Sequence, residues 1–264
     1  MSDVLTTELQ DGLLILRMTR TYRRNALDAA LTAALRDAAA AAAHDDAVRA
    51  VLLTGSGGHF CVGGDVKAMN QGQGAEMSLG ERMHALRDRM SVSQYLHDMA
   101  KPTIAAIEGS CAGAGLSMAL SCDLRICAED AKITTAFAKV GLSGDYGGTY
   151  FMTQILGAAK ARELYLTSPV LSGQQAADIG LVTRAVPAAE VFETARALAA
   201  GLAAGPTLTL GRIKQNIALA ESGGSLADCF AQEARNHMLS STTADHREAA
   251  AAFVEKRKPV FSGS

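Results

Sequence analysis

The sequence predicts an α/β protein with a layered or coiled core, and three observations support this prediction. Patterns of strand, helix and strand occur near the N-terminus and again around residues 103–127. The chain has 264 residues, of which 48% are hydrophobic, so it can bury a sizeable core. Only helical patterns follow Ala188. We expect an α/β core over residues 1–198 and a C-terminal helical region over residues 199–264 that packs on this core or on a neighbouring subunit.

The first elements are predicted to be a strand hairpin and a helix. Residues 4–10 and 13–18 are rich in apolar side chains and flank an Asp-Gly pair at 11–12, which is typical of a two-residue hairpin turn. Asp28 is placed to cap the Ala-rich helix that follows, which reaches about Ala43. These patterns predict that the chain begins with two paired strands and then a helix.

A second cycle of strand, helix and strand is predicted further along the chain. A run of β-branched and leucine residues at 48–54 indicates the strand that completes the first cycle. Residues 103–107 then indicate a strand, 113–121 a helix of small residues, and 124–127 another strand. Repetition of similar units favours the layered or coiled core.

The segment between the two cycles predicts a loop and a helix. Residues 69–80 are rich in Gly and Gln, which is typical of a mobile loop beside a site, and a helical pattern runs from Leu79 to Met99. The pattern is helical again after Thr149, and Ser172 with Gln175 forms a capping box.

The last predicted strand lies at residues 181–186, and helices follow it. Pro206 suits the first turn of one helix, and Gly223-Gly224 predicts a break between helices. Residues 225–253 then predict two more helices.

Composition narrows the possible partners. The chain has 25 basic and 27 acidic residues, so its net charge of -2 predicts neither nucleic-acid nor membrane binding. No apolar run approaches a membrane span, and the first ten residues lack the pattern of a secretory signal, so we expect a cytoplasmic protein. The five cysteines lie in apolar surroundings without metal-binding spacing, which favours buried free thiols and predicts no metal site.

Two glycine-rich segments follow predicted strands. The first is GSGGHFCVGGD at residues 55–65, and the second is GSCAGAG at residues 109–115, at the start of a predicted helix. Amides in the first turn of a helix are free donors at the positive end of the helix dipole, and they suit a developing oxyanion. Each segment alone is equally well explained as a close-packed turn.

Together the two segments resemble those of the crotonase, or enoyl-CoA hydratase/isomerase, superfamily. FCVGGD at residues 60–65 and the run from Gly109 to Asp123 carry the resemblance, and RNAL at residues 24–27 is similar to the family's early coenzyme A contact region. The similarity extends over essentially the whole chain. It implies a crotonase-like spiral of strand-strand-helix units, with a C-terminal helical trimerisation region that builds homotrimers or hexamers.

The resemblance also implies the positions of the site residues. The backbone amides of Val62 and Ala114 would form an oxyanion hole for the thioester carbonyl of an acyl-CoA substrate. The coenzyme A part of that substrate would be held by five residues, and no separate cofactor is implied. These five residues are Arg24, Ala26, Gly64, Asp65 and Val66.

The sequence departs from the hydratases at the two positions where they carry catalytic glutamates, because Ser117 and Phe137 stand there. Asp145 matches the single catalytic aspartate of members that resemble enoyl-CoA isomerases. One carboxylate can move a proton between two carbons, and burial would raise its pKa toward the working range. The other interpretation of Asp145 is an aspartate that supports a glycine-rich turn.

These expectations favour an enoyl-CoA isomerase that shifts a double bond through an enolate, with Asp145 as acid and base. Two alternatives stay open, an enoyl-CoA hydratase and a catalytically silent acyl-CoA-binding homologue. A dehalogenase of the same superfamily would use a tryptophan to hold its aspartate, and this chain has no tryptophan.

Overall fold

A computed structural model describes residues 4–65 and 77–264. Six strands form the main sheet, in the order β1-β2-β3-β4-β6-β9. The first two are antiparallel and the other neighbours are parallel. The bounds of these strands are β1 Leu5–Gln10, β2 Leu13–Met18, β3 Ala50–Gly55, β4 Thr103–Ile107, β6 Leu124–Ala128 and β9 Arg184–Val186.

A second, smaller sheet has the order β5-β7-β8 and is built from short strands that the sequence patterns did not predict. Their bounds are β5 Ser110–Ala112, β7 Lys132–Thr134 and β8 Leu171–Ser172. They are too short for a period-2 pattern to stand out. Successive strands alternate between the sheets, since β4 and β6 belong to the main sheet and β5 and β7 to the small one. This alternation confirms the predicted spiral of strand-strand-helix units.

The helices are found where helical patterns predicted them. The long ones are α1 Ala29–His44, α3 Leu79–Asp98, α5 Gly148–Thr167, α7 Val191–Ala203, α8 Thr207–Glu221, α9 Leu226–Ser241 and α10 Ala244–Glu255. Two shorter helices are α4 Ala114–Ser121 and α6 Gly173–Asp178, and single 3-10 turns occupy η1 Thr21–Arg23, η2 Ala138–Val140 and η3 Ala188–Glu190.

Local sequence signals decide several of these boundaries. The hairpin pairs Gln10 with Leu13, as the Asp-Gly turn predicted. The Asp28 carboxylate accepts from the Leu31 amide at 2.8 Å and so caps α1. Ser172 forms the predicted capping box at the start of α6.

Two boundaries differ from the prediction. A strand was expected at 181–186, but β9 begins only at Arg184. The Leu181 and Val182 amides donate to the Ala176 carbonyl oxygen and close the end of α6 instead. Pro206 takes the N-cap position of α8 instead of its first turn. Most of the loop expected at 69–80 lies outside the described residues, and α3 begins behind a Ser78 cap.

The buried core lies between the main sheet and its helices. Strands β3 and β4 are buried along their whole length, as expected for central parallel strands covered on both faces. Helix α7 packs across β3, β4 and β6, and the predicted division after residue 198 falls inside it.

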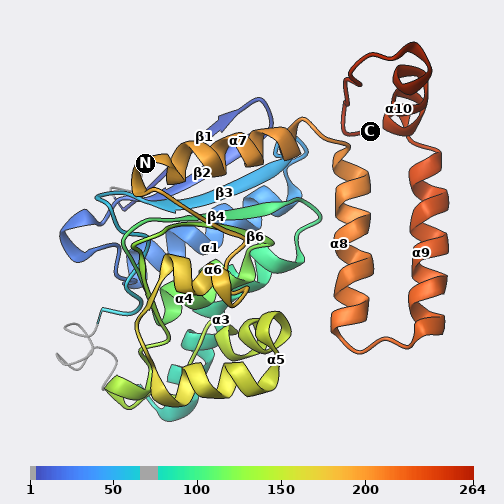
Figure 1. The fold of residues 1–264 in the computed structure, drawn as a ribbon. Helices are drawn as coiled ribbons and strands as arrows, with labels where there is room; N and C mark the ends of the chain where they lie inside the picture. Colours follow the sequence, from blue (N-terminus) through green and yellow to red (C-terminus); the bar gives the residue numbers. More distant parts are fainter. Residues whose placement is uncertain (1–3, 66–76) are drawn as a thin grey trace.

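Figure 1 shows α8 and α9 side by side, standing apart from the sheet, with the C-terminus near α10. The separate helical region stays a prediction. No helix in the described part of the chain is long and apolar enough to cross a membrane.

Candidate active site

The two glycine-rich segments lie against each other at the ends of β3 and β4. Cys61 and Cys111 form an isolated parallel bridge. The Cys61 amide donates to the Ser110 carbonyl oxygen at 3.1 Å, and the Ala112 amide donates to the Cys61 carbonyl oxygen at 2.9 Å. A methyl group added to Gly115 would lie 2.3 Å from that Cys61 oxygen. The close approach of the segments therefore requires glycine at this position.

Replacing Gly115 with alanine tests this contact. We expect Gly115→Ala to lower the free energy of unfolding by about 1–3 kcal/mol or more, because backbone atoms must move to admit the methyl group. The matched control is Gly201→Ala in α7, where an added methyl group meets no atom within 4 Å. There we expect stability to rise by up to about 1 kcal/mol, since alanine is the better helix former. Denaturant unfolding of both variants measures the difference, and equal effects would contradict the described contact.

The Ala114 amide has no hydrogen-bond partner in the described part of the chain. Ala114 is the first residue of α4, and among residues 4–65 and 77–264 its N–H donates to no other group. Gly63 lies directly against it, because a methyl group on Gly63 would be 3.3 Å from the Ala114 nitrogen. The neighbouring Val62 amide donates to the Arg24 carbonyl oxygen at 3.3 Å, longer than the roughly 2.7–3.2 Å of most such bonds. The structure therefore leaves the Ala114 amide without a partner among the described residues and gives the Val62 amide one long bond. The pairing of these amides on one oxygen stays a prediction.

Asp145 lies in the glycine-rich loop between η2 and α5. Its Oδ1 atom is buried and has no hydrogen-bond partner in the described part of the chain. Burial raises the pKa of Asp145 from 3.8 to about 6. A buried carboxylate oxygen without a partner is costly, and such groups are found most often at functional sites. The turn-supporting interpretation of Asp145 would predict a bonded carboxylate, so this observation favours the catalytic one.

Phe137 connects the Asp145 loop to the glycine-rich segments. A methyl group added to Gly113 would be 3.9 Å from the Phe137 ring, and one added to Gly144 would be 4.0 Å from the same ring. Gly113 precedes Ala114, and Gly144 precedes Asp145. The same aromatic ring therefore lies beside the residues that precede the predicted oxyanion donor and the predicted acid.

The other departure from the hydratases, Ser117, is buried beside Tyr165. Ser117 is 1% exposed, and a methyl group added to Gly148 would be 2.2 Å from its oxygen and 2.4 Å from the Tyr165 oxygen. The Tyr165 ring is stacked on Phe137, with 6.0 Å between centroids and 5° between planes. Tyr165 thus lies beside both residues that the resemblance places at the hydratase glutamate positions. Sequence reasoning did not find it, because a tyrosine in a long helix carries no pattern that marks a site.

The predicted coenzyme A segment packs against the first glycine-rich segment. The Leu27 amide donates to the Gly63 carbonyl oxygen at 2.8 Å, and the Asp65 amide donates to the Leu27 carbonyl oxygen at 3.2 Å. Leu27 and Gly64 form a bridge, Arg24 is exposed, and Ala26 is buried beside them. Val66 lies outside the described residues. The contacts of these residues with coenzyme A stay predictions.

Arg20 supports this region and was not singled out from the sequence. Its guanidinium is buried and forms ion pairs with Asp28 at 3.0 Å and with Asp65 at 3.7 Å. It also donates to the Ala26 carbonyl oxygen. Asp65 therefore helps to hold its loop against the 24–28 segment.

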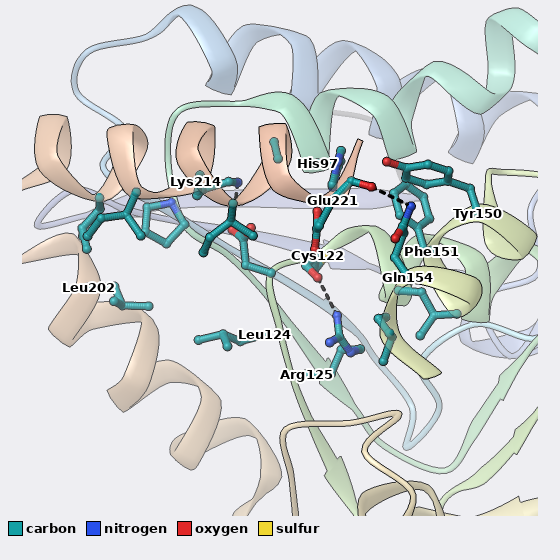
Figure 2. Close-up of a pocket in the computed structure, with 18 residues that line it drawn as sticks. His97, Cys122, Leu124, Arg125, Tyr150, Phe151, Gln154, Leu202, Lys214 and Glu221 are labelled. Carbon is teal, nitrogen blue, oxygen red and sulfur yellow. Dashed lines mark hydrogen bonds and ion pairs between the residues drawn. The ribbon is translucent and has the colours of Figure 1, made fainter. Parts of the chain in front are cut away.

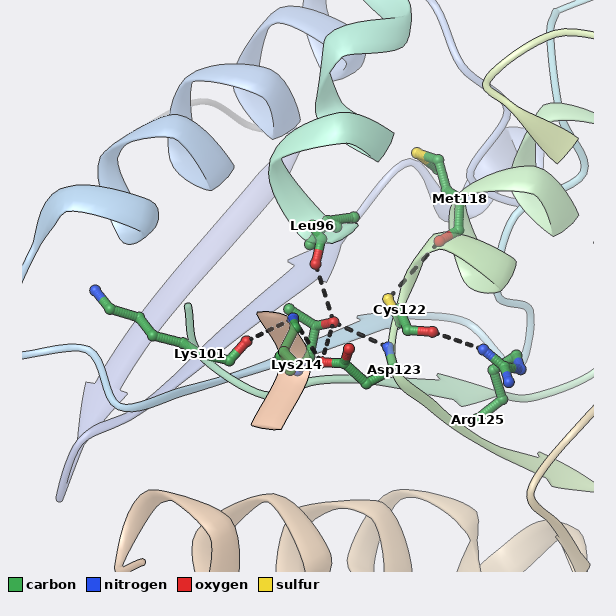
Figure 3. A network of polar contacts seen from close by, with 8 residues as sticks. Leu96, Lys101, Met118, Cys122, Asp123, Arg125 and Lys214 are labelled. Atoms are coloured by element: carbon green, nitrogen blue, oxygen red, sulfur yellow. Dashed lines mark hydrogen bonds and ion pairs between the residues drawn. The ribbon is translucent and has the colours of Figure 1, made fainter. Parts of the chain in front are cut away.

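A separate cavity lies between α8 and the core. Its volume is about 340 Å³, and Figure 2 shows residues of α5 and α8, with Leu124 and Arg125 of β6, around it. None of the predicted site residues lines it. Figure 3 shows the polar network beside it, in which the Asp123 Oδ2 atom accepts from the Lys214 ammonium group at 2.8 Å and from the Thr103 amide at 2.7 Å. This network ties α8 to the start of β4.

The cysteines and His59 are explained by packing and by backbone contacts in the described part of the chain. Four of the five cysteines are buried free thiols, as predicted, and burial raises the pKa of Cys61 to about 12. The His59 Nδ1 atom accepts from the Ser110 amide at 3.2 Å, so this histidine braces the two glycine-rich segments. In the described part of the chain no three His, Cys, Asp or Glu side chains are grouped to hold a metal ion.

Comparison with known proteins agrees with this fold. A model of the enoyl-CoA hydratase/isomerase family matches residues 8–264. The chain is 35% identical to 1,2-epoxyphenylacetyl-CoA isomerase from Escherichia coli, with 100% of both chains covered. It is 35% identical to a probable enoyl-CoA hydratase from Rhodobacter capsulatus, over 97% of this chain and 96% of that one. It is also 32% identical to 4-chlorobenzoyl coenzyme A dehalogenase-2 from an Arthrobacter species, over 96% and 91% of the two chains.

Solved structures show the same similarity in three dimensions. A putative enoyl-CoA hydratase/isomerase from Mycobacterium abscessus superimposes with a TM-score of 0.93 at 30% identity, over 98% of this chain and 100% of that one. A putative enoyl-CoA hydratase from Streptomyces coelicolor gives a TM-score of 0.93 at 33% identity, over 99% and 94%. The spiral fold is thus that of crotonase-type acyl-CoA enzymes. Within this class, the chain belongs to the enoyl-CoA hydratase/isomerase family.

Proposed function

We propose that the protein is an enoyl-CoA isomerase that moves a double bond from the β,γ to the α,β position of an acyl-CoA thioester, with Asp145 as acid and base. The observation that carries this proposal is the half-buried Asp145 side chain, whose buried Oδ1 atom has no partner among the described residues. The family resemblance places Ser117 and Phe137 at the two positions at which hydratases carry glutamates. A single carboxylate suits proton transfer between two carbons, which needs no bound water.

The proposed reaction has two proton transfers. The Asp145 carboxylate removes a proton from the carbon next to the thioester carbonyl, and the electron pair of that C–H bond forms an enolate whose charge lies on the thioester oxygen. The amides of Val62 and Ala114 donate to this oxygen, and such aimed donors typically lower the barrier by about 3 kcal/mol each. Asp145 then delivers a proton, which exchanges with solvent while the enolate is bound, to the γ carbon, and the double bond moves as the carbonyl re-forms. The residues 24–27 and 64–66 would hold the coenzyme A part.

The elevated pKa of Asp145 supports this role. A carboxyl group with a pKa of about 6 is mostly ionised at neutral pH, yet it is a stronger base than an ordinary aspartate. The full-length similarity to an isomerase points the same way. The similar hydratase keeps hydration open as the second candidate, and the similar dehalogenase is a poorer guide because this chain has no tryptophan to hold the acid.

A panel of CoA thioesters tests the proposal. Saturated, β,γ-unsaturated and aromatic acyl-CoA thioesters are incubated with the protein in deuterated water, and product mass and double-bond position are determined. We expect deuterium at the α carbon and conversion of β,γ to α,β double bonds, without a gain of one water. A product heavier by one water would establish the hydratase instead, and tight binding without exchange would establish a silent acyl-CoA-binding protein.

We also propose a homotrimer or a pair of trimers. The helices that stand apart from the sheet carry exposed apolar side chains, among them Ile217 of α8, Phe230 of α9 and Phe253 of α10. Such side chains are suited to contact with a second subunit. Sedimentation or light scattering would measure the assembly, and a monomer at micromolar concentration would contradict it.

A further inference from the structure

The first turn of α4 contains a hydrogen bond that reaches the predicted oxyanion donor. The Ser117 hydroxyl group donates to the Gly113 carbonyl oxygen at 3.3 Å, and the Ser117 amide donates to the same oxygen at 3.0 Å. The Gly113 carbonyl and the Ala114 N–H belong to one peptide unit. Donors at the carbonyl end of a peptide polarise it, and its N–H then becomes a better donor.

Tyr165 extends this chain by one hydroxyl group. Its oxygen lies beside the Ser117 oxygen, because a methyl group added to Gly148 would be 2.4 Å from the first and 2.2 Å from the second. The Ser117 hydrogen is used on the Gly113 carbonyl oxygen, so Tyr165 is the donor and Ser117 the acceptor when these two hydroxyl groups bond. Burial raises the pKa of Tyr165 to about 12, and this tyrosine therefore keeps its proton at any pH at which the protein works.

The surroundings hold these hydroxyl groups in place. The Tyr165 ring is stacked on Phe137, which restricts the orientation of the ring. Gly148 is packed against both oxygens, because a methyl group there would lie 2.2 Å from the Ser117 oxygen and 2.4 Å from the Tyr165 oxygen. No side chain larger than hydrogen at residue 148 is compatible with this arrangement.

We infer that Tyr165 is a positioning residue that acts through Ser117 on the Gly113–Ala114 peptide, orienting and polarising the amide that receives the thioester oxyanion. The inference rests on the proposed role of the Ala114 amide. The order of donors is Tyr165 hydroxyl, Ser117 hydroxyl, Gly113 carbonyl and Ala114 N–H. The serine that replaces a hydratase glutamate thus gains a role as the middle member of this relay.

The test uses Tyr165→Phe, which removes the hydroxyl group and keeps the stacked ring. The infrared stretching frequency of the thioester carbonyl is measured for bound cinnamoyl-CoA, and kcat and KM are measured with a β,γ-unsaturated thioester. We expect wild type to lower the carbonyl frequency on binding, and Tyr165→Phe to lower it less. We expect kcat to fall about threefold to tenfold, with KM within about twofold, which is the effect of one neutral hydrogen bond.

Two further variants separate the relay from a general effect on the fold. Ser117→Ala should reduce the carbonyl shift at least as much as Tyr165→Phe, and the double variant should match Ser117→Ala alone, because Tyr165 acts only through Ser117. Tyr150→Phe is the matched control, since Tyr150 lies on the same helix and is 44% exposed. It should behave as wild type.

Wild-type carbonyl frequency and kcat in Tyr165→Phe would overturn the inference, and so would additive effects in the double variant. A wrong assignment of the proposed function would give a different set of results. If Asp145→Asn keeps wild-type turnover while the carbonyl shifts follow the expected order, the proposed acid is wrong and the relay stands. If wild type produces no carbonyl shift, neither the oxyanion hole nor the relay exists.

Discussion

Asp145→Asn is expected to lower kcat for double-bond migration by about 10²–10⁴-fold, because it removes the only carboxylate proposed to carry the proton and keeps the size of the side chain. Binding of the acyl-CoA should change by less than about threefold, since the coenzyme A contacts and both amides remain. Steady-state kinetics, α-carbon deuterium exchange and calorimetric binding measure these effects together.

The matched control is Asp130→Asn, which alters an exposed aspartate in the turn after β6. This variant should keep wild-type turnover. Residual activity above about one tenth of wild type in Asp145→Asn would show that another group carries the proton. Equal losses in both variants would show that the effect is not specific to the site.

Asp145→Asn should also be more stable than wild type at neutral pH. Burial raises the pKa of folded-state Asp145 to about 6 from an ordinary 3.8, so the folded protein binds this proton more tightly than the unfolded chain does. The free energy of unfolding therefore falls as pH rises from about 4 through 6, by about 1–2 kcal/mol for a partly exposed group. Asp145→Asn lacks this fall. Urea unfolding at pH 4 and pH 7 should show the two proteins converging at the lower pH, and kcat/KM of wild type should rise through about pH 6.

Ala114→Pro is expected to reduce kcat by about 10²–10³-fold, the usual effect of losing one oxyanion donor. Proline has no N–H, and it is accepted at the first position of a helix, where that N–H has no partner within the helix. Ala114 is the first residue of α4, so the substitution removes the donor without breaking a helical hydrogen bond. The proline ring would also occupy the space into which the amide hydrogen points. Kinetics with a β,γ-unsaturated thioester measure the loss.

Ala29→Pro provides the matched control. Ala29 is also an alanine at the first position of a helix, it is exposed, and Asp28 before it has the extended backbone that proline requires. We expect it to fold and turn over as wild type. Thermal unfolding of both variants shows whether they are folded, and a folded Ala114→Pro with wild-type kcat would remove Ala114 from the oxyanion hole.

Local signals in the sequence were strong enough to predict most elements. The Asp-Gly turn, the Asp28 cap and the Ser172 capping box act within a few residues, so each could be read without knowledge of the fold. The three strands of the small sheet were missed because they are too short to show a pattern and are stabilised by partners distant in sequence, as in the pairing of Cys111 with Ile133. The last strand was predicted too long, since tertiary bonds close the end of α6 over its first residues.

The sequence by itself determined the family, the succession of strands and helices, and the two places where the hydratase glutamates are absent, because these depend on residue identity and on short-range patterns. Only the tertiary structure decided which groups meet. It placed Cys61 against Gly115, gave the Val62 amide a long bond to Arg24, and left the Ala114 amide and the buried Asp145 Oδ1 atom without partners among the described residues. It also brought the Tyr165 and Ser117 oxygens together at Gly148. Hydrogen bonding and burial depend on contacts between segments far apart in the chain, and no local pattern records them.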